Sequence, residues 1–161
     1  MFRVDVDSLK DYLDFDLERK SDLRKLDMLI RRSAPGLKRY FHTGTPAGEP
    51  GMRFKMIGYG KFQYLARNGQ YVVWPAVGVA LQKNYISVYL SVMKDGESLV
   101  QLYSCKLGKL KLGRNHFSFR TYEDLDVRLL ASLLAEREQI FQSDPHHCNL
   151  AQGGTRAIRA R

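Results

Sequence analysis

Segments with the two-residue period of β-strands are gathered in the middle of this chain, and segments with helical period lie on both sides of them. The clearest strand pattern is residues 85–92, Tyr-Ile-Ser-Val-Tyr-Leu-Ser-Val. A chain that alternated strands and helices would favour a parallel sheet, whereas strands grouped together favour an antiparallel one. We therefore predict an α+β fold whose twisted antiparallel β-sheet is built from residues 52–92 and 112–120.

Helices are predicted before and after these strands. A short helix follows Ser8, and a longer one spans residues 19–33 with leucine and isoleucine at helical spacing. The last helix covers residues 122–141 and begins with Thr121 and Asp124 in capping-box positions. The N-terminal and C-terminal helices are expected to cover the sheet.

Glycine and proline divide the middle of the chain into four or five strands. Asn68-Gly69 is a strong signal for a β-hairpin. Gly58-Tyr59-Gly60 interrupts one strand pattern and Pro75 ends the next. The residues between the helix at 19–33 and the first strand predict one helical turn around Tyr40, followed by a glycine-rich and proline-rich loop.

The 161 residues are about one domain's worth of chain. We predict a single α+β domain over residues 1–142 and a flexible basic tail over residues 143–161. No run of 18 apolar residues is present and the first residues include acids, so we expect a cytoplasmic protein with no membrane span. Cys105 and Cys148 are expected to be reduced thiols.

The positive charge is concentrated in one part of the sequence. The chain carries a net charge of +9, and residues 34–121 contain thirteen basic and three acidic residues. Such a segment attracts phosphates, nucleic acids or acidic partners, although a lysine-coated soluble surface has the same composition.

The candidate ligand site is a group of glycines and aromatic residues in this basic segment: Lys55, Gly58, Tyr59, Gly60, Lys61 and Trp74. Glycines let a backbone approach a ligand closely, and tyrosine and tryptophan offer an apolar body with a polar end. His116, on the polar side of its strand, is a possible contributor. The alternative is that Tyr59 and Trp74 are core residues and that the histidine is merely solvated or hydrogen-bonded.

Two other clusters contain metal-ligating residue types. His146-His147-Cys148 lacks the further ligands that a structural zinc site needs. Asp11, Asp14 and Glu18 share one face if the first helix continues past them, but basic residues interleave with the neighbouring acids, which favours a salt-bridged surface. We predict no metal site and no cofactor.

Several strings resemble the YdhG-like family of uncharacterised bacterial domains over about residues 8–140. They are MIGYG at 56–60, VGVALQKNYISVYL at 77–90, KDG at 94–96, LGKLKLG at 107–113 and YEDLD at 122–126. The resemblance implies an antiparallel sheet flanked by helices. One branch of these relatives resembles frataxin in fold and is described as an intracellular iron chaperone, a role that requires exposed oxygen ligands.

The sequence contains no Ser/His/Asp set in a recognisable context, no paired carboxylates in the predicted sheet and no cofactor fingerprint. We therefore expect a non-enzymatic binding domain for a small anionic or aromatic ligand or a protein partner. The alternatives are a frataxin-like iron or metal chaperone and nucleic-acid binding through the basic segment. The sequence leaves the oligomeric state open.

Overall fold

The structure is a computed structural model that describes residues 2–90, 93–94, 97–103, 108–113, 115–143 and 156–157. Four α-helices are described: α1 (Leu9–Asp14), α2 (Lys20–Ser33), α3 (Leu99–Leu102) and α4 (Val127–Ser143), with a 3-10 turn, η1 (Tyr122–Asp124), before α4. The strands are β1 (Arg39–His42), β2 (Met56–Leu65), β3 (Tyr71–Leu81), β4 (Ile86–Leu90), β5 (Met93–Lys94), β6 (Glu97–Ser98), β7 (Lys111–Leu112), β8 (His116–Phe119) and β9 (Arg156–Ala157).

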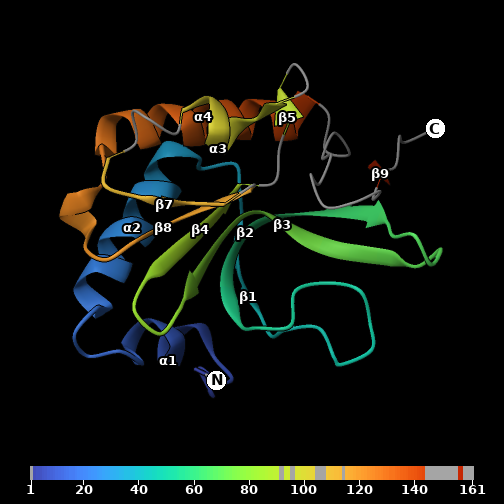
Figure 1. Cartoon of the computed structure of the whole chain (residues 1–161), viewed down its shortest axis with the longest axis horizontal. Helices are drawn as coiled ribbons and strands as arrows, with labels where there is room; N and C mark the ends of the chain where they lie inside the picture. The colour runs from blue at the N-terminus through green and yellow to red at the C-terminus, as the bar shows by residue number, and fades with distance from the viewer. Residues whose placement is uncertain are drawn as a thin grey trace.

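One antiparallel sheet organises the molecule (Figure 1). Its strands follow the order β1-β2-β3-β4-β8-β7, every pairing is antiparallel, and β9 pairs with β2 beside this path. The strands β5 and β6 form a separate small hairpin. The predicted α+β class and antiparallel sheet are confirmed.

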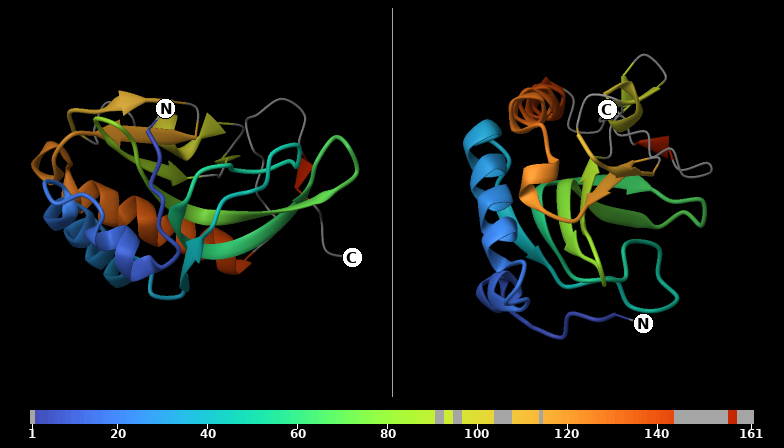
Figure 2. Two further views of the ribbon diagram at one scale, coloured as in Figure 1. Left: turned by 90° about the horizontal axis from the view of Figure 1, so that it is seen from below. Right: turned by 60° about the vertical axis from the view of Figure 1, so that its left-hand side comes forward.

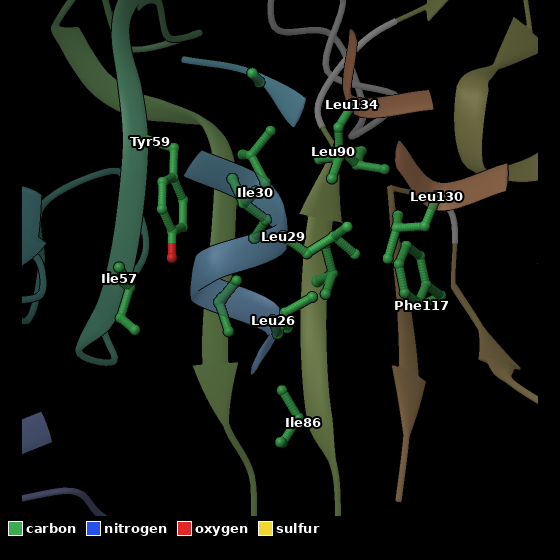
Figure 3. Packing of buried hydrophobic residues seen from close by; sticks show 14 of the residues in the cluster. Leu26, Leu29, Ile30, Ile57, Tyr59, Ile86, Leu90, Phe117, Leu130 and Leu134 are labelled. Carbon is green, nitrogen blue, oxygen red and sulfur yellow. The ribbon is translucent and has the colours of Figure 1, made fainter. Parts of the chain in front are cut away.

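The helices α2 and α4 cover one face of the sheet, as the second view of Figure 2 shows. The main hydrophobic cluster lies between these helices and the sheet. It includes Ile30 of α2, Ile57 of β2, Phe117 of β8 and Leu134 of α4 (Figure 3). Several of these side chains are fully buried, which at about 25 cal/mol per Å² of apolar surface makes this layer the main source of stability. The prediction that N-terminal and C-terminal helices cover the sheet is also confirmed.

The strands β2 and β3 are longer than the sequence indicates, because neither the glycines nor the proline ends them. The pairing skips Gly60 and Ala76 and resumes in the same register at Lys61 and Pro75, whereas β4 pairs with β3 only from Val77 onward. Pro75 therefore lies beyond the end of β4, where its missing N–H removes no hydrogen bond from a ladder on that side.

Residues 39–42 form the edge strand β1 rather than the expected helical turn. Tyr40 pairs with Gly58 and Phe41 with Ile57, so the strand is stabilised by partners far along the chain. Long-range pairing of this kind overrides the local helical spacing.

A second hydrophobic cluster lies on the opposite face of the sheet. It consists of Met52, Met56, Phe62, Val72, Trp74 and Ala80, and Tyr89 and Phe141 pack against it. Phe141, near the end of α4, contacts both clusters, so it marks the place where the two faces meet at the end of that helix.

Most of the predicted flexible tail lies outside the described residues. Within it, Arg156 and Ala157 pair with Leu65 and Tyr64 of β2. Among the described helices, none has the length and apolar character needed to cross a bilayer.

Candidate functional site

Tyr59 is a core residue on the helix-covered face. Its side chain is fully buried in the main hydrophobic cluster (Figure 3). Its hydroxyl donates a hydrogen bond of 2.7 Å to a carboxylate oxygen of Asp27 in α2. Burial, followed by the negative charge of Asp27, raises the pKa of Tyr59 well above its ordinary value. Asp27 also pairs with Arg39 at 2.7 Å and Arg31 at 3.2 Å. This network fastens α2 to β1 and β2, which is a structural role.

Trp74 and Lys55 lie elsewhere. Trp74 is 6% exposed and belongs to the second cluster, on the other face of the sheet from Tyr59. The ammonium group of Lys55 donates to the carbonyl of Val6 at 2.6 Å and lies 3.1 Å from a carboxylate oxygen of Asp7. Lys55 therefore anchors the N-terminal segment.

His116 lies in β8, on the face of the sheet opposite the helices, which we call the second face. Its ring stacks on Tyr89 with the centroids 5.0 Å apart, and burial lowers its pKa below the ordinary 6.5. The polar side of its strand was correctly assigned, but the ring is half-buried against an aromatic neighbour rather than solvated.

The predicted grouping of Lys55, Tyr59, Trp74 and His116 around one pocket is therefore not formed. Alternate residues of a strand point to opposite faces, and Tyr59 faces the helices whereas Trp74 faces away from them. The interpretation of both aromatic residues as core is the correct one.

Two residues of the predicted group do meet at a cavity. Gly60 and Lys61 line a groove of about 460 Å³ at the sheet edge, where β1 begins and α4 ends. Among the described residues, its lining consists of Gly36, Lys38, Arg39, Tyr40, Gly60, Lys61 and Phe141. Three of these side chains are cations and two are aromatic, and the described lining includes no carboxylate.

The cations of the groove differ in how they are neutralised. Arg39 is paired with Asp27. No described carboxylate lies within 4 Å of the ammonium groups of Lys38 and Lys61. Instead, the Lys61 ammonium lies 4.4 Å from the centre of the Tyr40 ring. Two exposed lysines at one groove leave a positive field that favours an anion.

Tyr40 forms part of the groove because glycine lies opposite it. A β-carbon on Gly58 would come 2.4 Å from Tyr40 Cζ, so the ring lies directly over the bare backbone of β2. The hydroxyl of Tyr40 is buried and has no hydrogen-bond partner among the described residues. Burial raises the pKa of this hydroxyl above its ordinary value of 10.0, which by itself keeps a tyrosine protonated at neutral pH.

Gly60 lines the groove beside the lysines and Tyr40. Its backbone is left-handed, with φ of 72°, and a β-carbon would come 2.9 Å from Leu37 and within 3.4 Å of Phe141. Glycine is needed here for both conformation and space. Protein side chains fill the space beside both glycines, Tyr40 at Gly58 and Leu37 with Phe141 at Gly60, so close approach of a ligand to this backbone stays a prediction.

Sequence analysis missed Lys38, Tyr40 and Phe141. Residues 37–41 were predicted as a helical turn, whereas they lead into the strand β1, which places Lys38 and Tyr40 at the sheet edge. The adjacent aromatic residues Tyr40 and Phe41, a residue type that favours strands, were the available signal. Phe141 comes from the end of α4, about eighty residues away, and only the packing of that helix brings it to β2.

No three histidine, cysteine, aspartate or glutamate side chains gather at one point in the described part of the chain. The helix α1 ends at Asp14, so Glu18 does not continue its face; Asp14 pairs with Arg24 and Asp16 with Arg19. The motif His146-His147-Cys148 and the thiol of Cys105 lie outside the described residues.

Comparison of the chain with family models, curated proteins and solved structures finds no match. The resemblance to the YdhG-like family accordingly rests on the sequence strings alone.

Proposed function

We propose that the groove at the edge of β1 binds a small ligand that carries an anionic group on a flat apolar body, and that the protein binds this ligand without transforming it. The observation that carries the proposal is the presence of two lysines without a described carboxylate partner beside two aromatic rings in one cavity. The lysines favour the anion, and Tyr40 and Phe141 favour the apolar body.

The backbone and hydroxyl groups support this assignment. Gly60 carries no side chain, so Leu37 and Phe141 pack close to the strand and Phe141 is brought to the wall of the groove. The buried hydroxyl of Tyr40 lacks a hydrogen-bond partner among the described residues, and a buried polar group without a hydrogen bond costs about 1–3 kcal/mol. A bound group or an ordered water that reached this hydroxyl would recover that cost.

Binding rather than catalysis is supported by the lining itself. A general base needs a titratable group within hydrogen-bond reach of the substrate. The described lining offers lysine, arginine and tyrosine, and the pKa of the tyrosine is raised. The raised pKa keeps the Tyr40 hydroxyl protonated, so it does not serve as a general base at neutral pH.

The test is a titration with phenyl phosphate, followed by the fluorescence of Trp74, the one tryptophan of the chain. Phe141 contacts both the groove and the cluster that contains Trp74, so occupancy of the groove should alter the emission. Phenol and inorganic phosphate each supply half of the ligand chemistry and should bind more weakly than phenyl phosphate.

The variant Lys61→Gln should weaken phenyl phosphate binding about tenfold, which corresponds to about 1.4 kcal/mol. The matched control is Arg67→Gln, which removes an exposed charge from the loop of the same hairpin. Equal binding of phenol and phenyl phosphate, or an unchanged affinity in Lys61→Gln, would overturn the proposal.

A further inference from the structure

A second basic surface lies at the opposite edge of the sheet from the groove. The exposed side chains Lys83, Lys109, Lys111 and Arg120 gather around Tyr85, where the β3–β4 turn meets β7 and the end of β8. We call these five residues the Tyr85 cluster. Within the described residues, no carboxylate lies within 4 Å of any of its four cations.

Two of the cations lie beside the same ring. The Lys111 ammonium is 5.6 Å and the Arg120 guanidinium 5.7 Å from the centre of Tyr85. Ladder geometry explains this arrangement, because Ile86 pairs with Phe119 and Lys111 with Ser118. Like charges held close together repel, so an anion that binds between them is favoured.

The turn that carries Tyr85 is fixed in place. The amide of Gln82 donates to the carbonyl of Tyr85 at 2.8 Å, and Arg19 donates to the carbonyls of both residues, also at 2.8 Å. Asp16 in turn holds the Arg19 side chain. A fixed turn loses little conformational entropy when a partner binds, so the surface is preorganised.

The surface is elongated rather than deep. Two shallow hollows of about 420 Å³ each share Arg120; one contains Tyr85, Lys109 and Lys111, and the other contains Lys83 and Asn84. Each hollow also contains one acid, Asp124 in the first and Glu18 in the second. Asp124 is engaged in the capping box of Thr121. The cations are therefore in excess along the whole path.

We infer that the Tyr85 cluster docks the phosphodiester backbone of a single-stranded nucleic acid. Cations spread along a shallow path fit successive phosphates of a chain better than one isolated phosphate, which would need a deeper site. The partly exposed Tyr85 ring offers a contact for a base or sugar at the centre of the path, a combination typical of surfaces that bind single strands. This surface is separate from the groove and does not depend on the proposed ligand.

The experiment measures fluorescence anisotropy of a labelled oligothymidylate of about a dozen nucleotides with the full chain. The double variant Lys111→Gln/Arg120→Gln should bind about tenfold more weakly or worse at low salt. Each phosphate contact that is lost should also reduce the slope of log K against log salt by about 0.7. Thermal melting of each variant checks that the fold is retained.

The matched control is Lys38→Gln/Lys61→Gln, which removes the same charge from the groove and should change the affinity less than twofold. Tyr85→Leu, which keeps every charge, should weaken binding several-fold. Three results would overturn the inference: an equal loss in both double variants, which indicates net charge alone; duplex binding as tight as single-strand binding; and displacement of the oligonucleotide by inorganic phosphate or polyglutamate at comparable charge concentration.

Discussion

Two tyrosines from neighbouring strands lie on opposite faces of the sheet and differ in the hydrogen bonding of their buried hydroxyls. Tyr59 of β2 faces the helices, and its buried hydroxyl is bonded to Asp27. Tyr40 of β1 lies on the other face over Gly58, and its buried hydroxyl has no partner among the described residues. The difference shows that a tyrosine near a glycine is structural where its buried hydroxyl has a hydrogen-bond partner. A ligand contact is favoured where that hydroxyl lacks a partner.

The largest expected effect on stability is at Asp27, the hydrogen-bond acceptor of Tyr59 on the helix-covered face. Replacement of Asp27 by alanine should lower the free energy of unfolding by about 3 kcal/mol, because it leaves Tyr59 and Arg39 without their shared acceptor. Chemical denaturation measures the loss. Glu49→Ala, in an exposed loop, serves as the control and should stay within about 0.5 kcal/mol of the parent; a similar loss in both would contradict the assigned role of Asp27.

The two tyrosines can be compared directly by removal of their hydroxyls. Tyr59→Phe should cost about 1–2 kcal/mol, since a hydrogen bond to a buried carboxylate is lost. Tyr40→Phe should change the free energy of unfolding by less than about 0.5 kcal/mol, or raise it, because no partner loses a bond. Equilibrium unfolding in urea tests both, and equal costs would remove the distinction between the two faces.

A methyl group on Gly58 should affect the groove more than the fold. In Gly58→Ala the new β-carbon displaces the far end of the Tyr40 ring, which can move, so we expect a cost of about 1 kcal/mol. Phenyl phosphate affinity should fall at least several-fold because the ring leaves its place in the groove. Unchanged affinity with a crystallographically displaced ring would show that Tyr40 does not contact the ligand.

The smallest effect concerns His116 on the second face. Burial lowers its pKa below 6.5, so the folded state favours the neutral ring. Well above pH 6.5 the ring is neutral in both states and contributes nothing to the pH dependence. As the pH falls below that value the unfolded chain binds the proton first, and stability falls by no more than about 1.4 kcal/mol per pH unit.

This contribution is isolated by comparison with His116→Gln. The variant should lose less stability than the parent between about pH 7.5 and about pH 5.5, as measured by thermal melting at each pH. Parallel curves for the two proteins would mean that His116 has the same pKa in the folded and unfolded states.

Local patterns predicted much of the fold correctly. Helix α2 ends at Ser33, the last residue of the helix predicted over residues 19–33, and Gly69 turns the β2–β3 hairpin with φ of 81°. Ser8 caps α1 through the amide of Asp11 at 3.1 Å. These features depend on neighbours within a few residues, so their signals are present in the sequence itself.

The candidate site depended on contacts that no local pattern contains. The sequence pointed to Gly58, Gly60 and Lys61 as a place where a ligand could approach, and Gly60 and Lys61 do line the groove. It could not decide which face Tyr59 takes, because a tyrosine in an alternating strand has the same pattern whether its hydroxyl meets solvent or a carboxylate. Tertiary structure decided this by placing Asp27 of α2 against one face and Phe141 of α4 at the edge of the other. Those residues are separated from β2 by long stretches of chain, and only the packing of helices on the sheet brings them together.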